Sequence, residues 1–375
     1  MRDFVNLDYY CSRAGKTDPV ANALNCLNSK LYFHCKTHFG AQRNWANMFM
    51  QTALLCAVRD GAGALRDFGS YSFLASEYLG AQVLPCVQDF AVRRERLVGA
   101  PALELISERL RAGQAVTVNT FAERLPFFQS FRAFDAPYDP AVNIFPHFLL
   151  LVGGSDTELF YVEDPQVLDR RQFTAHPDNR HVGVIEKRLL LPALQAFAEI
   201  CEIAIDAGHV DYYTGPRYLR DFLAEELRAR RRGMASPDGW VLSCGDALGA
   251  LAACLAAPQA ELFGRHPLLQ RSGAPDLKTF LSWQFYDVLA AKKLQATALS
   301  EWEAHLDGAS FADVCLTHRY SVLVWEKVCR TLNTATPAGA RAGKRALAGA
   351  LDAARDIEDK LGRSVAAFLE EEVAA

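Results

Sequence analysis

Residues 145–165, FPHFLLLVGGSDTELFYVEDP, contain two short apolar runs separated by a turn-rich segment. Short apolar runs bounded by Gly, Pro and Asp are typical of β-strands, so we expect this segment to form a hairpin. If Ser155 and Asp156 form a two-residue loop, His147 lies directly opposite Asp164, with Cβ atoms ~5 Å apart. A carboxylate there can orient an imidazole and stabilise its protonated form, as the acid of a catalytic triad does. A purely structural bond between a strand-end histidine and an aspartate is the other interpretation.

A helix is expected over residues 22–39, because apolar residues recur there with helical spacing and Gly40 follows. One face of this helix is apolar and consists of Leu24, Leu27, Leu31 and Cys35. Cys26 lies roughly opposite that face, since successive helical residues turn by ~100°. Packing therefore explains Cys35 but not Cys26. A thiol in the first turn of a helix has its pKa lowered by the helix dipole, so we expect Cys26 to be a nucleophile. An unreactive, half-buried cysteine is the alternative.

The composition is that of an ordinary globular protein with two domains. The chain has 375 residues, a net charge of −4 and mixed acidic and basic residues, which do not favour binding to nucleic acid or to an anionic membrane. No apolar run reaches the ~20 residues of a membrane span, and the N-terminal segment lacks the apolar core of a signal peptide. The ten cysteines include no C-x-x-C pair, so they predict neither a disulfide framework nor a zinc ribbon. We expect a cytoplasmic protein with reduced cysteines.

The order of periodic segments predicts an α+β domain over residues 1–191, followed by an all-helical domain over 192–375. In the first domain, helices are expected over 44–60 and 101–112. Strands are expected over 115–121 and 183–191, in addition to the hairpin. The second domain is expected to be helical from its first segment, PALQAFAEICEIAI, onward.

The segment that opens with Asn25-Cys26 and ends in H-F-G, and the later motif P-H-F-L-L-L-V-G-G…Y-V-E-D-P, together resemble a known fold. They are similar to the papain-like domains of bacteriocin-processing peptidases, and more closely to the butirosin biosynthesis protein H family of acyltransferases. The segment 212–227, YYTGPRYLRDFLAEEL, is similar to the C-terminal part of that family, so the resemblance spans most of the chain. It implies a papain-like first domain with the triad Cys26, His147 and Asp164.

The oxyanion hole is where this sequence departs from the peptidases. They usually carry a Gln several residues before the catalytic Cys, whereas no Gln precedes Cys26. The backbone N–H of Cys26 and the side chain of Asn22 or Asn25 are the candidates here.

The resemblance implies transfer of an acyl group from a carrier-protein thioester to a small amine, in specialised-metabolite biosynthesis. The phosphopantetheine arrives on the acyl carrier protein, and the enzyme needs no metal or organic cofactor of its own. A cysteine peptidase or amidase is the alternative, because these enzymes share the thioester intermediate. A non-catalytic binding protein that keeps the fold is a third interpretation.

Two basic segments are candidates for carrier docking. The first is Arg230, Arg231 and Arg232 at the end of a predicted helix, where a solvated basic terminus is the simpler interpretation. The second is the segment 93–96, Arg-Arg-Glu-Arg.

Two further motifs predict little chemistry. His34 and His38 have a zinc-compatible spacing on a helix, but no third ligand is evident. The segment 243–246, Ser-Cys-Gly-Asp, lacks the G-x-S-x-G frame of a hydrolase elbow and is expected to cap a helix.

Overall fold

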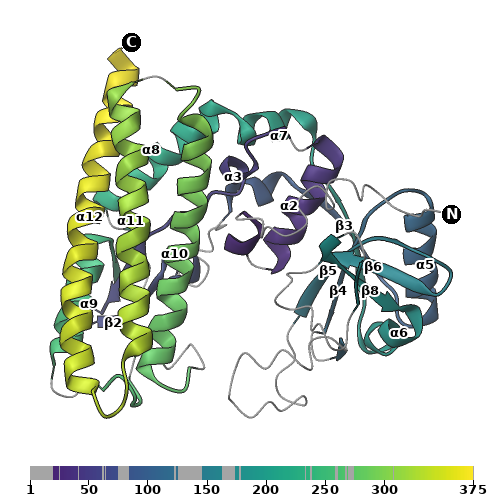
Figure 1. Ribbon diagram of the computed structural model, residues 1–375, viewed down its shortest axis with the longest axis horizontal. Helices are drawn as coiled ribbons and strands as arrows, with labels where there is room; N and C mark the ends of the chain where they lie inside the picture. The colour runs from purple at the N-terminus through teal and green to yellow at the C-terminus, as the bar shows by residue number, and fades with distance from the viewer. Residues whose placement is uncertain are drawn as a thin grey trace. The chain divides into compact units, whose positions relative to one another are not determined.

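The computed structural model shows a mixed α/β protein with antiparallel sheets and a helical C-terminal region (Figure 1). It describes residues 20–24, 26–40, 42–60, 63, 65–74, 84–121, 124–125, 146–162, 174–176, 179–232, 234–236, 239–257, 261–266, 268, 274–306 and 308–374. The chain divides into two compact units. Unit 1 comprises Met1–Arg43 and Asp89–His209, and unit 2 comprises Asn44–Gln88 and Val210–Ala375.

The described strands of unit 1 form one seven-stranded antiparallel sheet, in the order β3-β9-β4-β5-β6-β8-β7. Their bounds are Ala91–Arg96 (β3), Val116–Phe121 (β4), Pro146–Gly154 (β5), Glu158–Val162 (β6), Thr174–His176 (β7), Asn179–Glu186 (β8) and Glu199–Ala204 (β9). The predicted strands that correspond to β4, β5 and β6 are confirmed, because each is a short apolar run bounded by turn residues.

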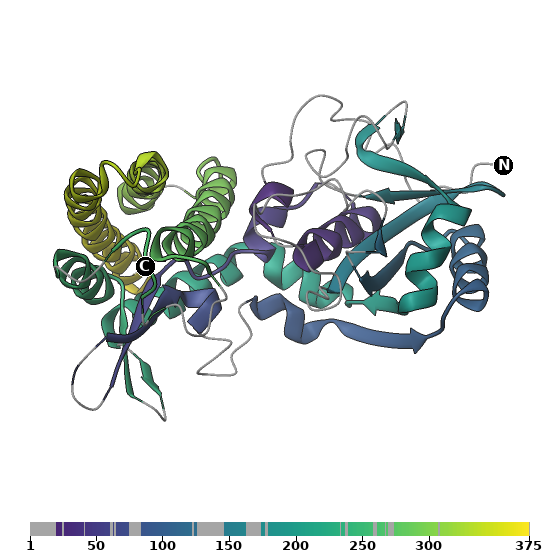
Figure 2. The ribbon, with the colours of Figure 1, turned by 90° about the horizontal axis from the view of Figure 1, so that it is seen from below.

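Helices cover both faces of this sheet, as Figures 1 and 2 show. On one face, α5 (Ala100–Arg111) and α6 (Lys187–Ala196) pack against the sheet in a core that includes Val118 and Leu149. On the other face lies α2 (Cys26–Phe39), which packs against β5. A short 3-10 helix, η1 (Ala21–Ala23), precedes α2, and η3 (Pro85–Asp89) precedes β3.

Unit 2 combines a small sheet with helices. The sheet has four strands in the order β10-β11-β1-β2, with bounds Met234–Ser236 (β10), Gly239–Ser243 (β11), Leu55–Arg59 (β1) and Leu65–Ser70 (β2). The short helices are α3 (Trp45–Met48) and α4 (Tyr71–Leu74), and α7 (Ala207–Thr214) runs across the boundary between the units. The longer helices are α8 (Pro216–Arg232), α9 (Gly245–Ala256), α10 (Leu277–Trp302), α11 (Ala309–Thr334) and α12 (Ala340–Ala374). Figure 1 shows α10, α11 and α12 side by side.

The expected division of the chain after residue 191 needs correction. Residues 44–88 belong to unit 2, because β1 pairs with β11 on one side and with β2 on the other. Unit 1 in turn continues to His209, because β9 pairs with β3 and β4. For the same reason the prediction of an all-helical second domain is wrong: a sheet built from strands of residues 55–70 and 234–243 lies within unit 2.

Three predicted elements also differ from the observed ones. The helix expected over 44–60 is only α3, and the buried strand β1 follows it. The strand expected over 183–191 ends at Glu186, where α6 begins. The first segment of the second domain is not one helix, because α6 ends at Ala196 and β9 follows. β9 lies between β3 and β4 in the sheet. This pairing, rather than the local helical periodicity, makes the segment a strand.

Candidate functional site

Cys26 is the first residue of α2, and η1 lies just before it. The predicted helix is therefore confirmed over its larger part, with Cys26 at its N-terminal end. No acidic residue occupies the first turn of α2. The helix dipole therefore gives a positive local potential at this end that no first-turn carboxylate offsets, which favours a thiolate. The side chains of Cys26 and Asn22, and the whole of Asn25, lie outside the described residues.

The burial of α2 differs from the predicted one-sided pattern. Leu31 and Cys35 are buried as expected, but every residue from 28 to 36 is buried, including Lys30 and Lys36. The Lys36 ammonium donates to the hydroxyl of Tyr32 and lies 4.5 Å from the centroid of that ring, which compensates its burial. The helix is enclosed around much of its surface, so its apolar stripe alone does not distinguish Cys26 from its neighbours.

Cys35 has the packing role that the sequence predicts. Its side chain is fully buried, and burial raises the pKa of its thiol well above the ordinary value. A neutral, enclosed thiol is a poor nucleophile at neutral pH. Cys35 is therefore a suitable internal reference for the reactivity of Cys26.

His147 is the second residue of β5 and is buried. It pairs with Thr120 of β4, so the two side chains share one face of the sheet with Leu149. The Thr120 hydroxyl donates to the carbonyls of Ala193 (3.2 Å) and Phe197 (2.7 Å), at the end of α6 and just beyond it. His147 is thus assigned to the α6 face of the sheet, whereas α2 packs on the other face.

The turn of the β5–β6 hairpin lies at a different position from the predicted one. Gly154 pairs with Leu159, and the N–H of Ser155 donates to the carbonyl of Glu158 at 2.9 Å. The register also shifts between Leu151 and Gly153. The predicted loop of Ser155 and Asp156, from which direct opposition of His147 and Asp164 was derived, is therefore wrong. Asp164 itself lies outside the described residues, so its role in a triad stays a prediction.

Arg230 does not belong to a docking surface. Its side chain is only 7% exposed and forms ion pairs with Glu226 (2.7 Å) and Glu358 (2.8 Å). The prediction that Arg230 meets a carrier protein is wrong, because α8 turns this residue into the interior of unit 2. Arg231 and Arg232 are the last residues of α8, and their side chains lie outside the described part of the chain.

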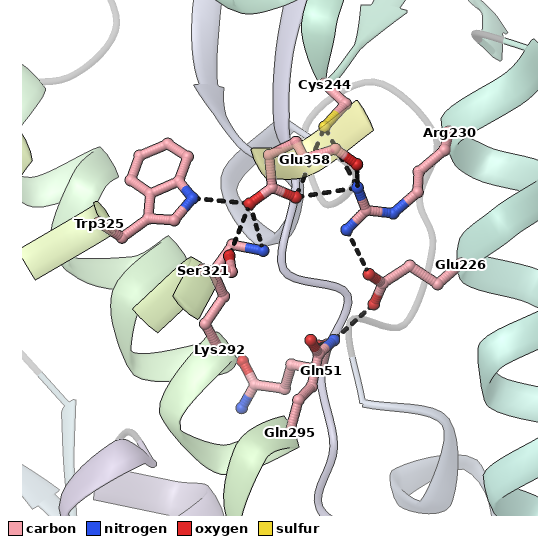
Figure 3. Close-up of polar contacts among 9 residues, drawn as sticks. All are labelled: Gln51, Glu226, Arg230, Cys244, Lys292, Gln295, Ser321, Trp325 and Glu358. Carbon is pink, nitrogen blue, oxygen red and sulfur yellow. Dashed lines mark hydrogen bonds and ion pairs between the residues drawn. The ribbon is translucent and has the colours of Figure 1, made fainter. Parts of the chain in front are cut away.

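Glu358 is the centre of the buried polar cluster around Arg230 (Figure 3). Its carboxylate forms ion pairs with Arg230 (2.8 Å) and Lys292 (2.7 Å), and accepts hydrogen bonds from Ser321 (2.9 Å) and Trp325 (2.8 Å). Burial raises the pKa of Glu358, but Lys292 and Arg230 together outweigh this effect and hold it well below the ordinary value. The carboxylate is therefore charged, and it joins α8, α10, α11 and α12.

Cys244 is a residue whose backbone conformation the sequence did not reveal. It connects β11 directly to α9 with φ 56° and ψ −113°, the one positive φ among the non-glycine residues that the structure describes. Its side chain lines a cavity of about 460 Å³ together with Arg230 and Glu358. Burial raises the pKa of the thiol to about 12, although Arg230 lies 3.4 Å away and lowers it. Cys244 is thus a protonated thiol at a tight strand-to-helix turn. It occupies the N-cap position of α9, so the expected helix cap is at this segment, but its side chain makes no capping hydrogen bond.

The histidine pair on α2 does not form a metal site with other described residues. The rings of His34 and His38 are 4.3 Å apart. In the described part of the chain, however, no three His, Cys, Asp or Glu side chains are grouped closely enough to hold a metal ion. Burial, and then the neighbouring His38, lower the pKa of His34 from 6.5 to about 4.

Acidification should destabilise the fold through His34. Because its folded-state pKa is lower than its unfolded value, the unfolded chain binds the proton first, and stability falls as the pH drops below about 6.5. We expect His34 to contribute a loss of about 2 kcal/mol between pH 7 and pH 5. Urea unfolding at the two pH values measures it. His34→Gln should reduce the loss by about that amount, whereas the more exposed His38→Gln should change it less. An unchanged loss in His34→Gln would contradict the assignment.

No protein-family model matches this chain, and none of the curated proteins is significantly similar to it in sequence. Among the described residues, no helix is both long and apolar enough to cross a membrane.

Proposed function

We propose that the protein is a cysteine-dependent acyltransferase that forms amide bonds, with Cys26 as nucleophile, His147 as general base and acid, and Asp164 as the residue that orients His147. The observation that carries the proposal is the packing of α2 against β5. The first residue of α2 is Cys26 and the second residue of β5 is His147. Two candidate groups, 121 positions apart in the sequence, thus begin two elements that pack together.

The proposed contact lies at the end of the sheet and not across its face. His147 is assigned by strand alternation to the α6 face, and α2 covers the opposite face. Both residues are at the beginning of their elements. The proposal therefore requires the imidazole and the thiol to meet around the beginning of β5. In this arrangement the thiol meets the imidazole in front of the N-terminus of α2. The helix dipole stabilises the thiolate there, and the backbone N–H of Cys26 is the proposed donor to an oxyanion.

The chemistry follows from these groups. Cys26 gives its proton to His147, and its sulfur attacks the carbonyl carbon of the donor thioester. When the tetrahedral intermediate collapses, the donor C–S bond breaks and His147 returns the proton to the leaving thiol. An amine then attacks the acyl-Cys26 thioester, His147 removes a proton from it, and the amide is released with the Cys26 thiol. Asp164 holds the imidazole in the productive tautomer.

Arg93, Arg94 and Arg96 of β3 are candidates for carrier docking, and Arg231 and Arg232 stay candidates beside them. Arg94 and Arg96 are 58% and 76% exposed, and both reach the buried carboxylate of Glu199. β3 is the first strand in the sheet order and pairs with β9. These fixed but exposed cations provide a surface that attracts an acidic carrier, with an effect mainly on the association rate.

The test is acylation of the protein by a thioester. Incubation with an acylated carrier protein, or with an acyl N-acetylcysteamine thioester, should add one acyl mass, and peptide mapping should place it on Cys26. Cys26→Ala should abolish the adduct and the transfer while preserving the fold. Cys35→Ala, the matched control on the same helix, should keep the adduct and lower the unfolding free energy by about 1–3 kcal/mol.

The same experiment separates the alternatives. Release of the amide on addition of an amine supports transfer, and release of the free acid alone identifies a hydrolase of the peptidase or amidase type. An adduct that persists in Cys26→Ala, or that maps to Cys35, contradicts the assignment of the nucleophile.

A further inference from the structure

A second cavity of unit 2, with a volume of about 350 Å³, is lined by residues of the small sheet and of α9. Its apolar walls are formed by Leu65 of β2 and by Ala250, Ala253 and Ala257, in α9 and just after it. Its polar lining consists of Arg59, Cys254 and His266. Apolar walls with a few convergent polar groups are the usual form of a small-molecule site, so this cavity is a candidate for one.

Cys254 and His266 form a hydrogen-bonded pair in this cavity. The Cys254 sulfur lies 3.5 Å from Nε2 of His266, and the backbone N–H of Leu268 donates to Nδ1 of the same ring at 3.2 Å. Burial lowers the pKa of His266, so its ring is neutral at pH 7 and carries one proton. Because Nδ1 is an acceptor, we assign this proton to Nε2, which then donates to the sulfur. This tautomer stabilises a thiolate and leaves Nε2 without a lone pair for a metal ion.

Cys254 is also the most accessible of the cysteines whose side chains the structure describes. The seven others are buried, whereas Cys254 is half-buried. Its partial burial raises the pKa of the thiol, and the nearby ammonium of Lys344 opposes this effect. That ammonium is held in place, because it donates to the carbonyl of Ala257 at 3.1 Å. A small reagent that enters the cavity therefore reaches this sulfur before the buried ones.

The charges around the cavity favour an anionic ligand. Arg59 is exposed at the end of β1 and lines the cavity, and the described lining residues include no carboxylate. Lys344 adds a second positive charge near the sulfur. Cations beside a thiol attract an anionic reagent and stabilise the thiolate that attacks it. The cavity is therefore suited to a small molecule that combines a carboxylate with a centre that reacts with sulfur.

We propose that this cavity is a modification site, at which Cys254 forms a reversible mixed disulfide with a small disulfide that bears carboxylates. The Cys254 thiol releases its proton to solvent, and the thiolate attacks one sulfur of the ligand. The ligand S–S bond breaks as the new S–S bond forms, and the leaving thiolate takes a proton from solvent. The ligand is the oxidant, because one half of it is reduced as Cys254 is oxidised. The proposal does not depend on the proposed activity, since Cys26 belongs to unit 1 and Cys254 to unit 2.

Incubation of the full chain with dithiodiglycolate, a small dicarboxylic disulfide, tests the site. Peptide mass spectrometry should find one thioglycolate group on Cys254, and dithiothreitol should remove it. Fragment spectra must distinguish Cys254 from Cys244, because no Lys or Arg separates them. Buried Cys35 is the internal reference and should stay unmodified over the same time. If Cys254 stays unmodified, or reacts no faster than Cys35, the proposal is overturned.

A neutral reagent of similar size, hydroxyethyl disulfide, tests the selection of a carboxylate. Arg59→Gln should slow the reaction of Cys254 with dithiodiglycolate by about threefold or more, and should change the reaction with hydroxyethyl disulfide by less than about twofold. Arg217→Gln makes the same change in charge at an exposed position of α8 that does not line the cavity, and should leave both rates unchanged. Equal slowing of both reagents by Arg59→Gln would overturn this selection.

The role of His266 is tested by removal of its donor. His266→Phe keeps an aromatic ring but cannot donate to the sulfur, so it should slow the reaction of Cys254 with both disulfides severalfold. His305→Phe is the matched control, since His305 is exposed just after α10 and does not line the cavity. It should leave both rates unchanged. Equal rates for the wild type and His266→Phe would overturn the assignment of His266 as the donor.

Discussion

Glu358→Gln is expected to lower the unfolding free energy by about 3–5 kcal/mol, the cost of removing one partner from a buried ion pair. The Glu358 side chain is 1% exposed, and that of its partner Lys292 is fully buried. Glutamine keeps the volume but leaves Lys292 without an opposing carboxylate. Arg230 is affected less, because it retains Glu226. Equilibrium unfolding in urea measures the difference.

An exposed ion pair between α10 and α11 provides the control. Glu326 pairs with Lys293 at 2.8 Å, with the two side chains 35% and 49% exposed. Glu326→Gln should cost less than about 1 kcal/mol, because solvent screens the pair. In addition, the double variant Glu358→Gln with Lys292→Met should recover part of the loss, since it removes both charges. If Glu358→Gln and Glu326→Gln lowered the unfolding free energy by similar amounts, Glu358 would not be the centre of a stabilising buried cluster.

Acidification should reduce the stability that the Glu358 cluster contributes. Because the pKa of Glu358 is lower in the folded protein than in the unfolded chain, its contribution is fully present above the ordinary glutamate pKa and is lost as the pH falls below that value. Glu358→Gln should therefore lose less stability on acidification than the wild type does.

Asp164→Asn is expected to slow acyl transfer by about 10⁴-fold, by analogy with the same substitution in a serine-protease triad. Asparagine preserves the shape of the side chain but cannot stabilise the imidazolium, and it favours the wrong tautomer of His147. The rate of amide formation from a thioester donor and a saturating amine measures the effect.

Asp156→Asn is the matched control for this substitution. Asp156 is exposed in the turn of the same hairpin, and its replacement should leave the rate within about twofold. A decrease of less than tenfold in Asp164→Asn would remove Asp164 from the triad.

The strands of the hairpin could be predicted from the sequence because the signals are local. Apolar runs bounded by Gly and Pro predicted β5 and β6, and the run that ends at Gly113 predicted α5. The register was not predictable in the same way. It depends on which residue of the GGSDT segment ends the ladder, and the observed turn lies at a different position, with a shifted register.

The remaining differences arise from long-range contacts. The local sequence of β1 predicted the continuation of a helix. The segment is a strand because β2 and β11 pair with it. Arg230 is part of a basic helix end in the sequence, and only the approach of α12, far along the chain, makes it a buried partner of Glu358. Cys244 has its unusual φ at the direct connection of β11 to α9. No residue type near it in the sequence predicts a positive φ.

The central claim is that the thiol of Cys26 and the imidazole of His147 form one reactive pair. The most direct measurement is the pH dependence of alkylation by iodoacetamide, resolved by peptide mass spectrometry at Cys26, with buried Cys35 as the internal reference. If the pair exists, Cys26 of the wild type is alkylated well below pH ~8.5, and His147→Ala moves the profile up toward the pKa of an ordinary thiol. Superimposable profiles for the wild type and His147→Ala would contradict the claim.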